Sequence, residues 1–138
     1  MSLLDCVCCW RHHFRAAVCW DNPSEFSPTV LTYSCLVERA ISVCNVLRTD
    51  YQSTDATPQS PAGARLFPPV AIYGRSCPEV LCALLGIMAV PAPYMPLDLG
   101  QPSANWWPTL RACGVHTLLV EVSLFSVSAG LYLLWNSS

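Results

Sequence analysis

The sequence predicts an α/β fold: a partial three-layer unit in which βαβ strands are covered by helices. Two observations carry this prediction. Short apolar runs at residues 70–73 and 92–95 are typical of buried strands. Two helical stretches, at 32–48 and 78–90, alternate with them along the chain. A strand, a crossover helix and a second strand form a βαβ unit, which is typical of a parallel sheet.

The first elements are expected at the N-terminal end. Residues 1–15 have a roughly helical spacing of apolar side chains and are expected to form an amphipathic helix. Residues 15–20 and 28–33 are expected to be strands, with a turn at 21–23 between them. The two strands therefore predict a β-hairpin.

The helix after this hairpin is expected to begin at Thr32 or Tyr33 and to end near Arg48. Its apolar positions recur every three or four residues, which places them on one face: Leu36, Val37, Ala40, Ile41, Val43, Cys44 and Leu47. Residues 49–69 contain four prolines and few apolar side chains. A loop of this length and polarity predicts a mobile insertion.

The helix at 78–90 has clear signals at both ends. Pro78 suits its first position, because the N–H that proline lacks is unpaired there. Glu79 interacts favourably with the helix dipole. Pro91 and Pro93 are expected to end the helix, because neither can donate a backbone hydrogen bond.

A further helix and a strand are expected after Asp98. Ser103 is a suitable cap for a helix through Cys113, and Gly114 is a suitable residue to end it. Four of its side chains are expected to face the core: Trp106, Trp107, Leu110 and Cys113. Residues 115–122 are expected to form the next strand.

Two segments carry a family resemblance. Residues 83–98 (ALLGIMAVPAPYMPLD) resemble the second core motif of adenylate-forming enzymes, whose usual form is ALLAILKAGAAYVPLD. Residues 31–36 (LTYSCL) look like the first core motif, LTYxEL, and residues 75–79 resemble a further RSxE segment. The resemblance spans residues 14–121. It implies the N-terminal subdomain of an ATP-dependent ligase that converts a carboxylic acid into an acyl-adenylate and then passes the acyl group to a thiol.

The departures from the motif are informative. Ala89, Pro91 and Pro93 stand where most members have Lys, Gly and Ala, and Cys35 replaces the usual Glu of the first motif. The segment Val-Pro-Ala looks most like the branch that activates beta-alanine, among the acyl-CoA synthetases and relatives of fatty acid metabolism.

The parts of the family that contact nucleotide have no counterpart here. The sequence contains no lysine and no glycine-rich run, both of which the family uses to hold the ATP phosphates. We therefore assign no catalytic, cofactor-binding or metal-binding residue, and we expect ATP, magnesium and phosphopantetheine to serve only a full-length relative. Residues 1–122 are expected to be a truncated adenylation domain that is inactive alone. Residues 123–138 are expected to be an apolar tail from outside the family, arising from alternative splicing or a gene-model error.

Composition limits the partners. A net charge of −2 argues against nucleic acid. With 53% hydrophobic and only 12% charged residues, the chain is expected to expose apolar surface that binds a protein or aggregates. Nine cysteines without a regular spacing or a signal peptide favour reduced thiols in an intracellular, cytoplasmic protein.

Four features of the sequence allow a functional interpretation beside a structural one. A cluster of sulfur and imidazole donors could hold zinc or copper, but its spacing is poor: Cys6, Cys8, Cys9, His12 and His13. Catalytic Cys–His pairs are conceivable at Cys9 with His13 and at Cys113 with His116. Asp98 and Glu121 invite an acid–base pair, although a turn role for Asp98 is favoured. Residues 118–135 have the length of a bilayer span, but a strand followed by a tail is favoured. The competing functions are a non-catalytic interaction or dominant-negative fragment and a small membrane-tailed protein.

Overall fold

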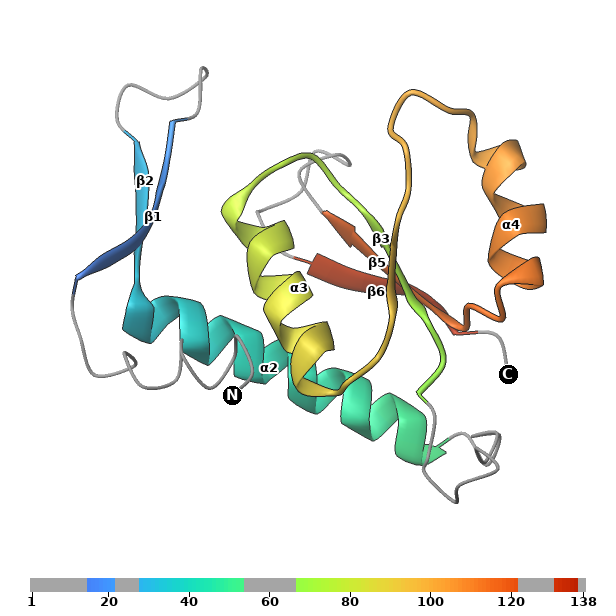
Figure 1. The fold of residues 1–138 in the computed structure, drawn as a ribbon, viewed down its shortest axis with the longest axis horizontal. Coiled ribbons are helices and arrows are strands. Elements are labelled where there is room, and N and C mark those ends of the chain that lie inside the picture. Colours follow the sequence, from blue (N-terminus) through green and yellow to red (C-terminus); the bar gives the residue numbers. More distant parts are fainter. Residues whose placement is uncertain (1–14, 22–27, 54–66, 122–130, 137–138) are drawn as a thin grey trace.

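The main body of the protein is a four-stranded sheet with helices on both faces (Figure 1). The computed structural model describes residues 15–21, 28–53, 67–121 and 131–136. The helix expected at 1–15 lies outside these residues, apart from Arg15. The partial three-layer α/β architecture expected from the sequence is confirmed.

A separate two-stranded ribbon precedes the main body. Strands β1 (Ala16–Trp20) and β2 (Thr29–Thr32) pair antiparallel, from Ala16 opposite Thr32 to Trp20 opposite Thr29. The predicted antiparallel strand pair is confirmed, while residues 22 and 23 of its predicted turn lie outside the described part. Figure 1 shows this ribbon standing beside the main sheet, above the beginning of α2.

Helix α2 (Tyr33–Ser53) begins where the sequence predicted and continues beyond the predicted end. The Oγ1 of Thr32 accepts a hydrogen bond from the backbone N–H of Cys35, 3.3 Å away, which is a typical N-cap interaction. The helix passes Arg48 because Tyr51 also packs in the core. Ile41, expected to face the core, is 48% exposed. It lies at the margin of the apolar stripe, where the neighbouring elements do not cover it.

The end of α2 is tied to the segment before the next strand. The hydroxyl of Tyr51 donates a hydrogen bond to the carbonyl of Pro68 at 3.1 Å, and its ring lies 5.1 Å from that of Phe67, centroid to centroid. These contacts fix the two sides of the predicted insertion at 49–69. Residues 54–66 of that insertion are outside the described part.

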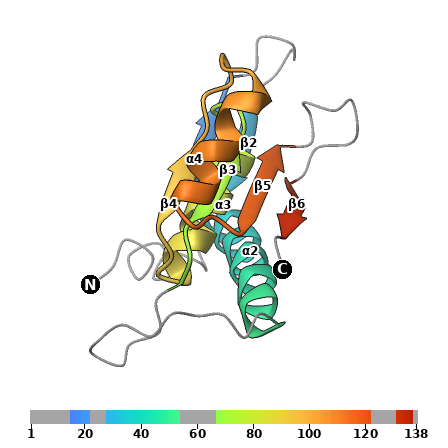
Figure 2. The ribbon, with the colours of Figure 1, turned by 90° about the vertical axis from the view of Figure 1, so that its right-hand side faces the viewer.

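The main sheet has the strand order β4-β3-β5-β6. Strand β3 (Val70–Tyr73) pairs in parallel with β4 (Tyr94–Pro96) on one side and with β5 (Thr117–Glu121) on the other. Strand β6 (Leu131–Asn136) runs antiparallel to β5 (Figure 2). The βαβ unit is confirmed, with β4 placed slightly later than the predicted 92–95.

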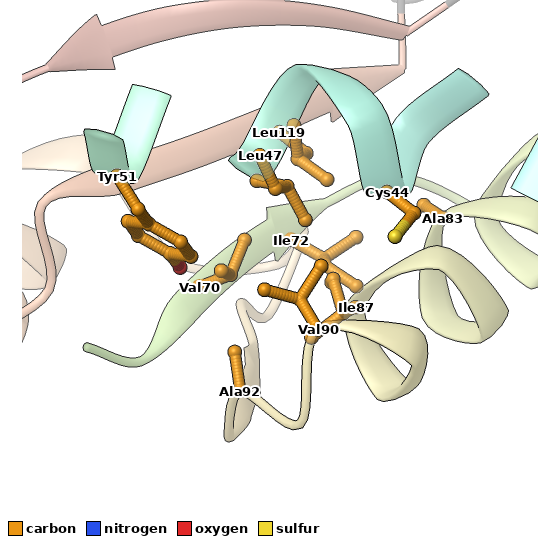
Figure 3. Packing of buried hydrophobic residues seen from close by; sticks show 10 residues of the cluster. All are labelled: Cys44, Leu47, Tyr51, Val70, Ile72, Ala83, Ile87, Val90, Ala92 and Leu119. Atoms are coloured by element: carbon orange, nitrogen blue, oxygen red, sulfur yellow. The ribbon is translucent and has the colours of Figure 1, made fainter. Parts of the chain in front are cut away.

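One face of the sheet is covered by α2 and by α3 (Pro78–Ala89), which is the crossover helix between β3 and β4. Side chains from these helices, from the turn after α3, and from β3 and β5 form the largest cluster (Figure 3): Cys44, Leu47, Tyr51, Val70, Ile72, Ala83, Ile87, Val90, Ala92 and Leu119. The helices approach closely at Gly86, where an added Cβ would lie 2.6 Å from the Cβ of Val43. A side chain at position 86 would therefore push α2 and α3 apart.

The other face is covered by a short 3₁₀ turn, η1 (Ser103–Asn105), and by α4 (Trp106–Ala112). Leu110 is fully buried there, in a cluster with Ala71, Val115, Leu118 and Val120. Trp106 packs against this cluster, as predicted. Trp107 is 40% exposed and Cys113 is exposed, so the expectation that both face the core is wrong. Helix α4 is short, and only one side of it contacts the sheet.

The apolar segment at 118–135 contains strands at both ends, in β5 and β6. Among the described residues, no helix has both the length and the apolar character needed to cross a bilayer.

Candidate functional site

The carboxyl ends of β3 and β5 are the first place to look for a site. From β3 the chain leaves through α3 toward β4, and from β4 it returns through α4 to β5 on the other side of β3. Ligands of open α/β sheets usually bind outside the carboxyl ends of the strands. The loop at 74–77 and Glu121 occupy this position.

Glu121 holds that loop in place. Glu121 as a residue is only 5% exposed. Oε2 of its carboxylate accepts a hydrogen bond from the backbone N–H of Arg75 at 2.7 Å. The Arg75 guanidinium adds an ion pair, with Nη2 3.3 Å from Oε1. Gly74 allows this approach, because a Cβ there would lie 2.8 Å from Cγ2 of Val80 and 3.1 Å from Cβ of Glu121. The buried carboxylate is therefore paired, as such a charge must be.

Cys77 lies beside this pair, at the N-terminal cap of α3. Its backbone is extended and its side chain makes no capping hydrogen bond. Burial, followed by smaller effects that include the charges of Glu121 and Glu79, raises the pKa of the thiol to about 11. Because the thiolate is the reactive form, Cys77 is a poor nucleophile near neutral pH.

Asp98 forms a turn, as the favoured reading of the sequence expected. Its Oδ1 accepts a hydrogen bond from the backbone N–H of Gly100 at 2.8 Å, and its carbonyl accepts one from Gln101 at 3.3 Å. Glu121 is the last residue of β5, whereas Asp98 follows β4, and β3 lies between these strands. The two carboxylates therefore have separate structural tasks, and the alternative of an acid–base pair gains no support.

The remaining candidates are two cysteine–histidine pairs and a cluster of possible metal ligands. Cys113 is exposed at the end of α4, where its backbone N–H donates to the carbonyl of Thr109 at 2.9 Å. His116 is half-buried just before β5. The donors at 6–13, which include the pair Cys9 and His13, lie outside the described residues. Within the part that the structure describes, no group of three or more His, Cys, Asp or Glu side chains is arranged to hold a metal.

A surface hollow lies over the outer side of η1 and α4. It has a volume of about 560 Å³ and is lined by Ala104, Trp107, Pro108 and Arg111. It is open, and its lining includes a single charged group, that of Arg111. The lining contains no nucleophile and no carboxylate.

Sequence reasoning missed two polar pairs that fasten the elements together. One is Arg75 with Glu121; the other joins the hydroxyl of Thr117 to Oδ2 of Asp50, 2.9 Å apart. Their partners are 46 and 67 residues apart in the chain. The available signal was a threonine and a glutamate at the two ends of an otherwise apolar strand, which indicates polar partners without identifying them.

The comparisons with known proteins agree with this architecture. No protein-family model matches the chain. Its sequence is 28% identical over 109 residues to human beta-alanine-activating enzyme and 26% identical over 108 residues to surfactin synthase subunit 1 of Bacillus subtilis strain 168. Each match covers 78% of this chain, but only 9% and 3% of the respective relatives.

Solved structures show the same fold. A fatty acid AMP ligase from Legionella pneumophila superposes with a TM-score of 0.68 at 15% identity, over 91% of this chain and 20% of that one. The N-terminal subdomain of Klebsiella oxytoca NpsA, in complex with 3-hydroxyanthranilyl-AMSN, has a TM-score of 0.61 at 22% identity, over 86% and 26% of the two chains. This chain is therefore similar to an N-terminal portion of adenylate-forming enzymes, in sequence to the two curated relatives and in fold to the solved structures.

Proposed function

We propose that the chain is the structural N-terminal part of an ATP-dependent ligase that forms acyl-adenylates, and that it does not adenylate an acid by itself. Residues 1–122 are the part that belongs to the adenylation domain, and residues 123–138 come from outside the family, although they include β6 of the main sheet. The observation that carries the proposal is the β3-α3-β4 unit, since the motif at 83–98 forms the second half of α3, the following turn and β4.

The polar groups in this unit and in the neighbouring strand β5 support a structural role. Glu121 is bonded to the loop after β3, Asp98 to its own turn, and Thr117 to α2. Adenylation requires groups that neutralise a triphosphate, and the whole sequence contains no lysine. The described residues therefore do not fit ATP and magnesium, and no catalytic step is assigned to them. Six cysteines in the described part are free thiols, which supports an intracellular location.

Exchange of pyrophosphate into ATP tests the predicted inactivity. The full chain is incubated with ATP, magnesium, labelled pyrophosphate and a panel of acids that includes beta-alanine, with human beta-alanine-activating enzyme as the positive control. We expect no exchange above the protein-free background. Exchange that depends on one of the acids would contradict the proposal.

A segment exchange tests the structural role and the branch. The matched 109 residues of human beta-alanine-activating enzyme are replaced by those of this chain, and the corresponding replacement is made in surfactin synthase subunit 1. We expect the first chimera to fold and retain exchange activity, and the second to lose more of it. In the matched controls, the two relatives exchange this segment with each other. Equal tolerance would contradict the beta-alanine branch, and loss of folding in both would contradict the structural role.

An interaction or dominant-negative fragment is the second candidate, favoured by the large apolar side chains that the structure leaves exposed. They are Val30, Ile41, Val46, Met88, Tyr94, Leu99 and Trp107. If such a fragment pairs with a full-length enzyme, added chain lowers the exchange rate of human beta-alanine-activating enzyme in proportion to its concentration. An unchanged rate at a large molar excess would remove this candidate.

A further inference from the structure

The segment formed by η1 and α4 has two apolar sides. Toward the sheet, Trp106 packs against the cluster in which Leu110 is fully buried. Away from the sheet, a spacing of three, four and seven residues places four residues on one side: Ala104, Trp107, Pro108 and Arg111. A surface helix usually has charged and polar residues on its outer side. Here the outer side has a single charge, that of Arg111, and Trp107 is 40% exposed.

These four outer residues line the open surface hollow of about 560 Å³. In Figure 2, α4 faces the viewer and no other described element lies over it. Pockets for small molecules usually enclose most of the ligand, which an open hollow does not do. An extended segment of a protein can lie across such a hollow and place one or two side chains in it. The shape therefore favours a protein segment over a small molecule.

The walls of the hollow are held in place by the fold. The ring of Pro108 fixes the backbone in the first turn of α4, where the N–H that proline lacks has no partner within the helix. Leu110 anchors the helix on the sheet, and the ring of Trp106 lies 4.4 Å from that of Tyr73, centroid to centroid. A surface that is ordered in advance loses little conformational entropy on binding.

Trp107 and Arg111 determine the chemistry of the occupant. Tryptophan and arginine are enriched among the side chains that dominate the binding energy of protein interfaces. The ion pairs of the described residues involve Arg39 and Arg75, and Arg111 has none among them. A carboxylate of a partner can therefore pair with Arg111 without displacing an internal partner, and the planar guanidinium can bond both of its oxygens.

We propose that this hollow binds a segment of a partner protein in which an Asp or Glu carboxylate pairs with Arg111 and a neighbouring proline packs on Trp107. Proline-rich segments dock on surfaces lined by aromatic side chains, because their extended conformation is formed before binding. The inference rests on the outer side of η1 and α4. It does not depend on the proposed ligase function, in which none of the four lining residues has a role.

Titration of the full chain with two synthetic peptides tests the proposal, with the backbone amide signals followed by NMR. One probe is Pro-Pro-Asp-Pro-Pro, acetylated and amidated at its ends, and the other has Asn in place of Asp. We expect the acidic peptide to shift amide signals within residues 104–112. We also expect it to bind about fivefold more tightly than the Asn peptide, which is the upper range for one exposed ion pair.

Three variants locate the binding on the hollow. Arg111→Gln should remove the preference for the acidic peptide, since the carboxylate then has no cation to pair with. Trp107→Ala should weaken both peptides about tenfold. Arg48→Gln is the matched control, because Arg48 is also exposed but lies on α2, which covers the other face of the sheet. It should bind both peptides as the unsubstituted chain does.

Several outcomes would overturn the proposal, and the first needs no variant. They are equal affinity of the unsubstituted chain for the two peptides, and the absence of shifts within residues 104–112. An equal effect of Arg48→Gln and Arg111→Gln is another. Benzoate that binds as tightly as the acidic peptide would make the hollow a small-molecule site. Shifts of the same amides with protein concentration, in the absence of peptide, would make it a contact between copies of this chain.

Discussion

Helices α3 and α4 end in related backbone turns. At the first position after the C-cap, however, α3 has Pro91 and α4 has Gly114. In α4, the N–H of Val115 donates to the carbonyl of Leu110 at 2.9 Å, and the N–H of Gly114 donates to that of Arg111 at 3.1 Å. These two bonds make a complete Schellman motif. In α3, the N–H of Ala92 donates to the carbonyl of Ile87 at 3.3 Å, which is the equivalent of the first bond.

The second bond cannot form in α3, because Pro91 occupies the position of Gly114 and has no N–H. The motif also requires a positive φ at this position. Gly114 adopts +67° without a steric penalty, whereas Pro91 is held at +27° although its ring favours about −65°. Most members of the family whose motif residues 83–98 resemble have glycine at this position. Packing of Ile87 and Ala92 in the main cluster maintains the turn despite this strain.

The largest effect is expected when the end of α4 is given the proline that follows α3. Gly114→Pro removes the hydrogen bond to Arg111 and places a proline at a φ of +67°. We expect the free energy of unfolding to fall by about 3 kcal/mol or more, which is the usual cost of a proline where its φ and N–H are both wrong. Urea denaturation followed by circular dichroism measures the loss.

Gly114→Ala is the control that separates the two causes. It retains the N–H, and its Cβ would meet no atom within 4 Å, so only the positive φ is penalised. We expect a loss of about 1 kcal/mol. If alanine proves as harmful as proline, the missing hydrogen bond is not the reason for the difference between the helix ends.

The next largest effect is expected from giving α3 the residue that α4 has. Pro91→Gly relieves the strained φ and restores a donor for the carbonyl of Met88, but it also loosens the unfolded chain. We expect a net gain of about 1–2 kcal/mol in the free energy of unfolding. Pro91→Ala restores the donor and retains a penalty at positive φ, so it should gain less. A loss of stability in both variants would show that Pro91 is not strained.

The helix ends also show what the sequence could and could not predict. Pro78, Gly114 and the end of α3 near Pro91 were predicted because each depends on local backbone chemistry. The backbone strain at Pro91 was not predicted. The sequence shows that a proline ends the helix, but it does not show which φ the path to the following strand requires there.

Long-range pairing explains most of the remaining differences. The helical period predicted the apolar stripe of α2. It could not show that the helix continues to include Tyr51, or that no neighbouring element covers Ile41. Strand β6 and the bond between Thr117 and Asp50 depend on segments far apart in the chain. At the candidate site, the same limit hid the pairing of Arg75 with Glu121.

The smallest effect is expected at the end of α2. There the side chain of Tyr51, and not a Schellman motif, ties the helix to the following segment. Tyr51→Phe removes the hydroxyl that donates to Pro68 and keeps the ring against Phe67. We expect a loss of about 1 kcal/mol at pH 8, the usual net value of one hydrogen bond. Urea denaturation of both proteins measures it. No loss would mean that ring packing alone holds this end.

The dependence of this difference on pH identifies its origin. Burial, assisted by the nearby charge of Asp50, raises the pKa of Tyr51 to about 12 from the ordinary value of 10.0. The folded state therefore holds the phenolic proton more tightly than the unfolded state does, so this contribution is complete below pH 10 and is lost as the pH rises toward 12. Tyr51→Phe lacks the group, and the stability difference between the two proteins should shrink over that interval. A constant difference would mean that the hydroxyl is as accessible to water in the folded chain as in the unfolded one.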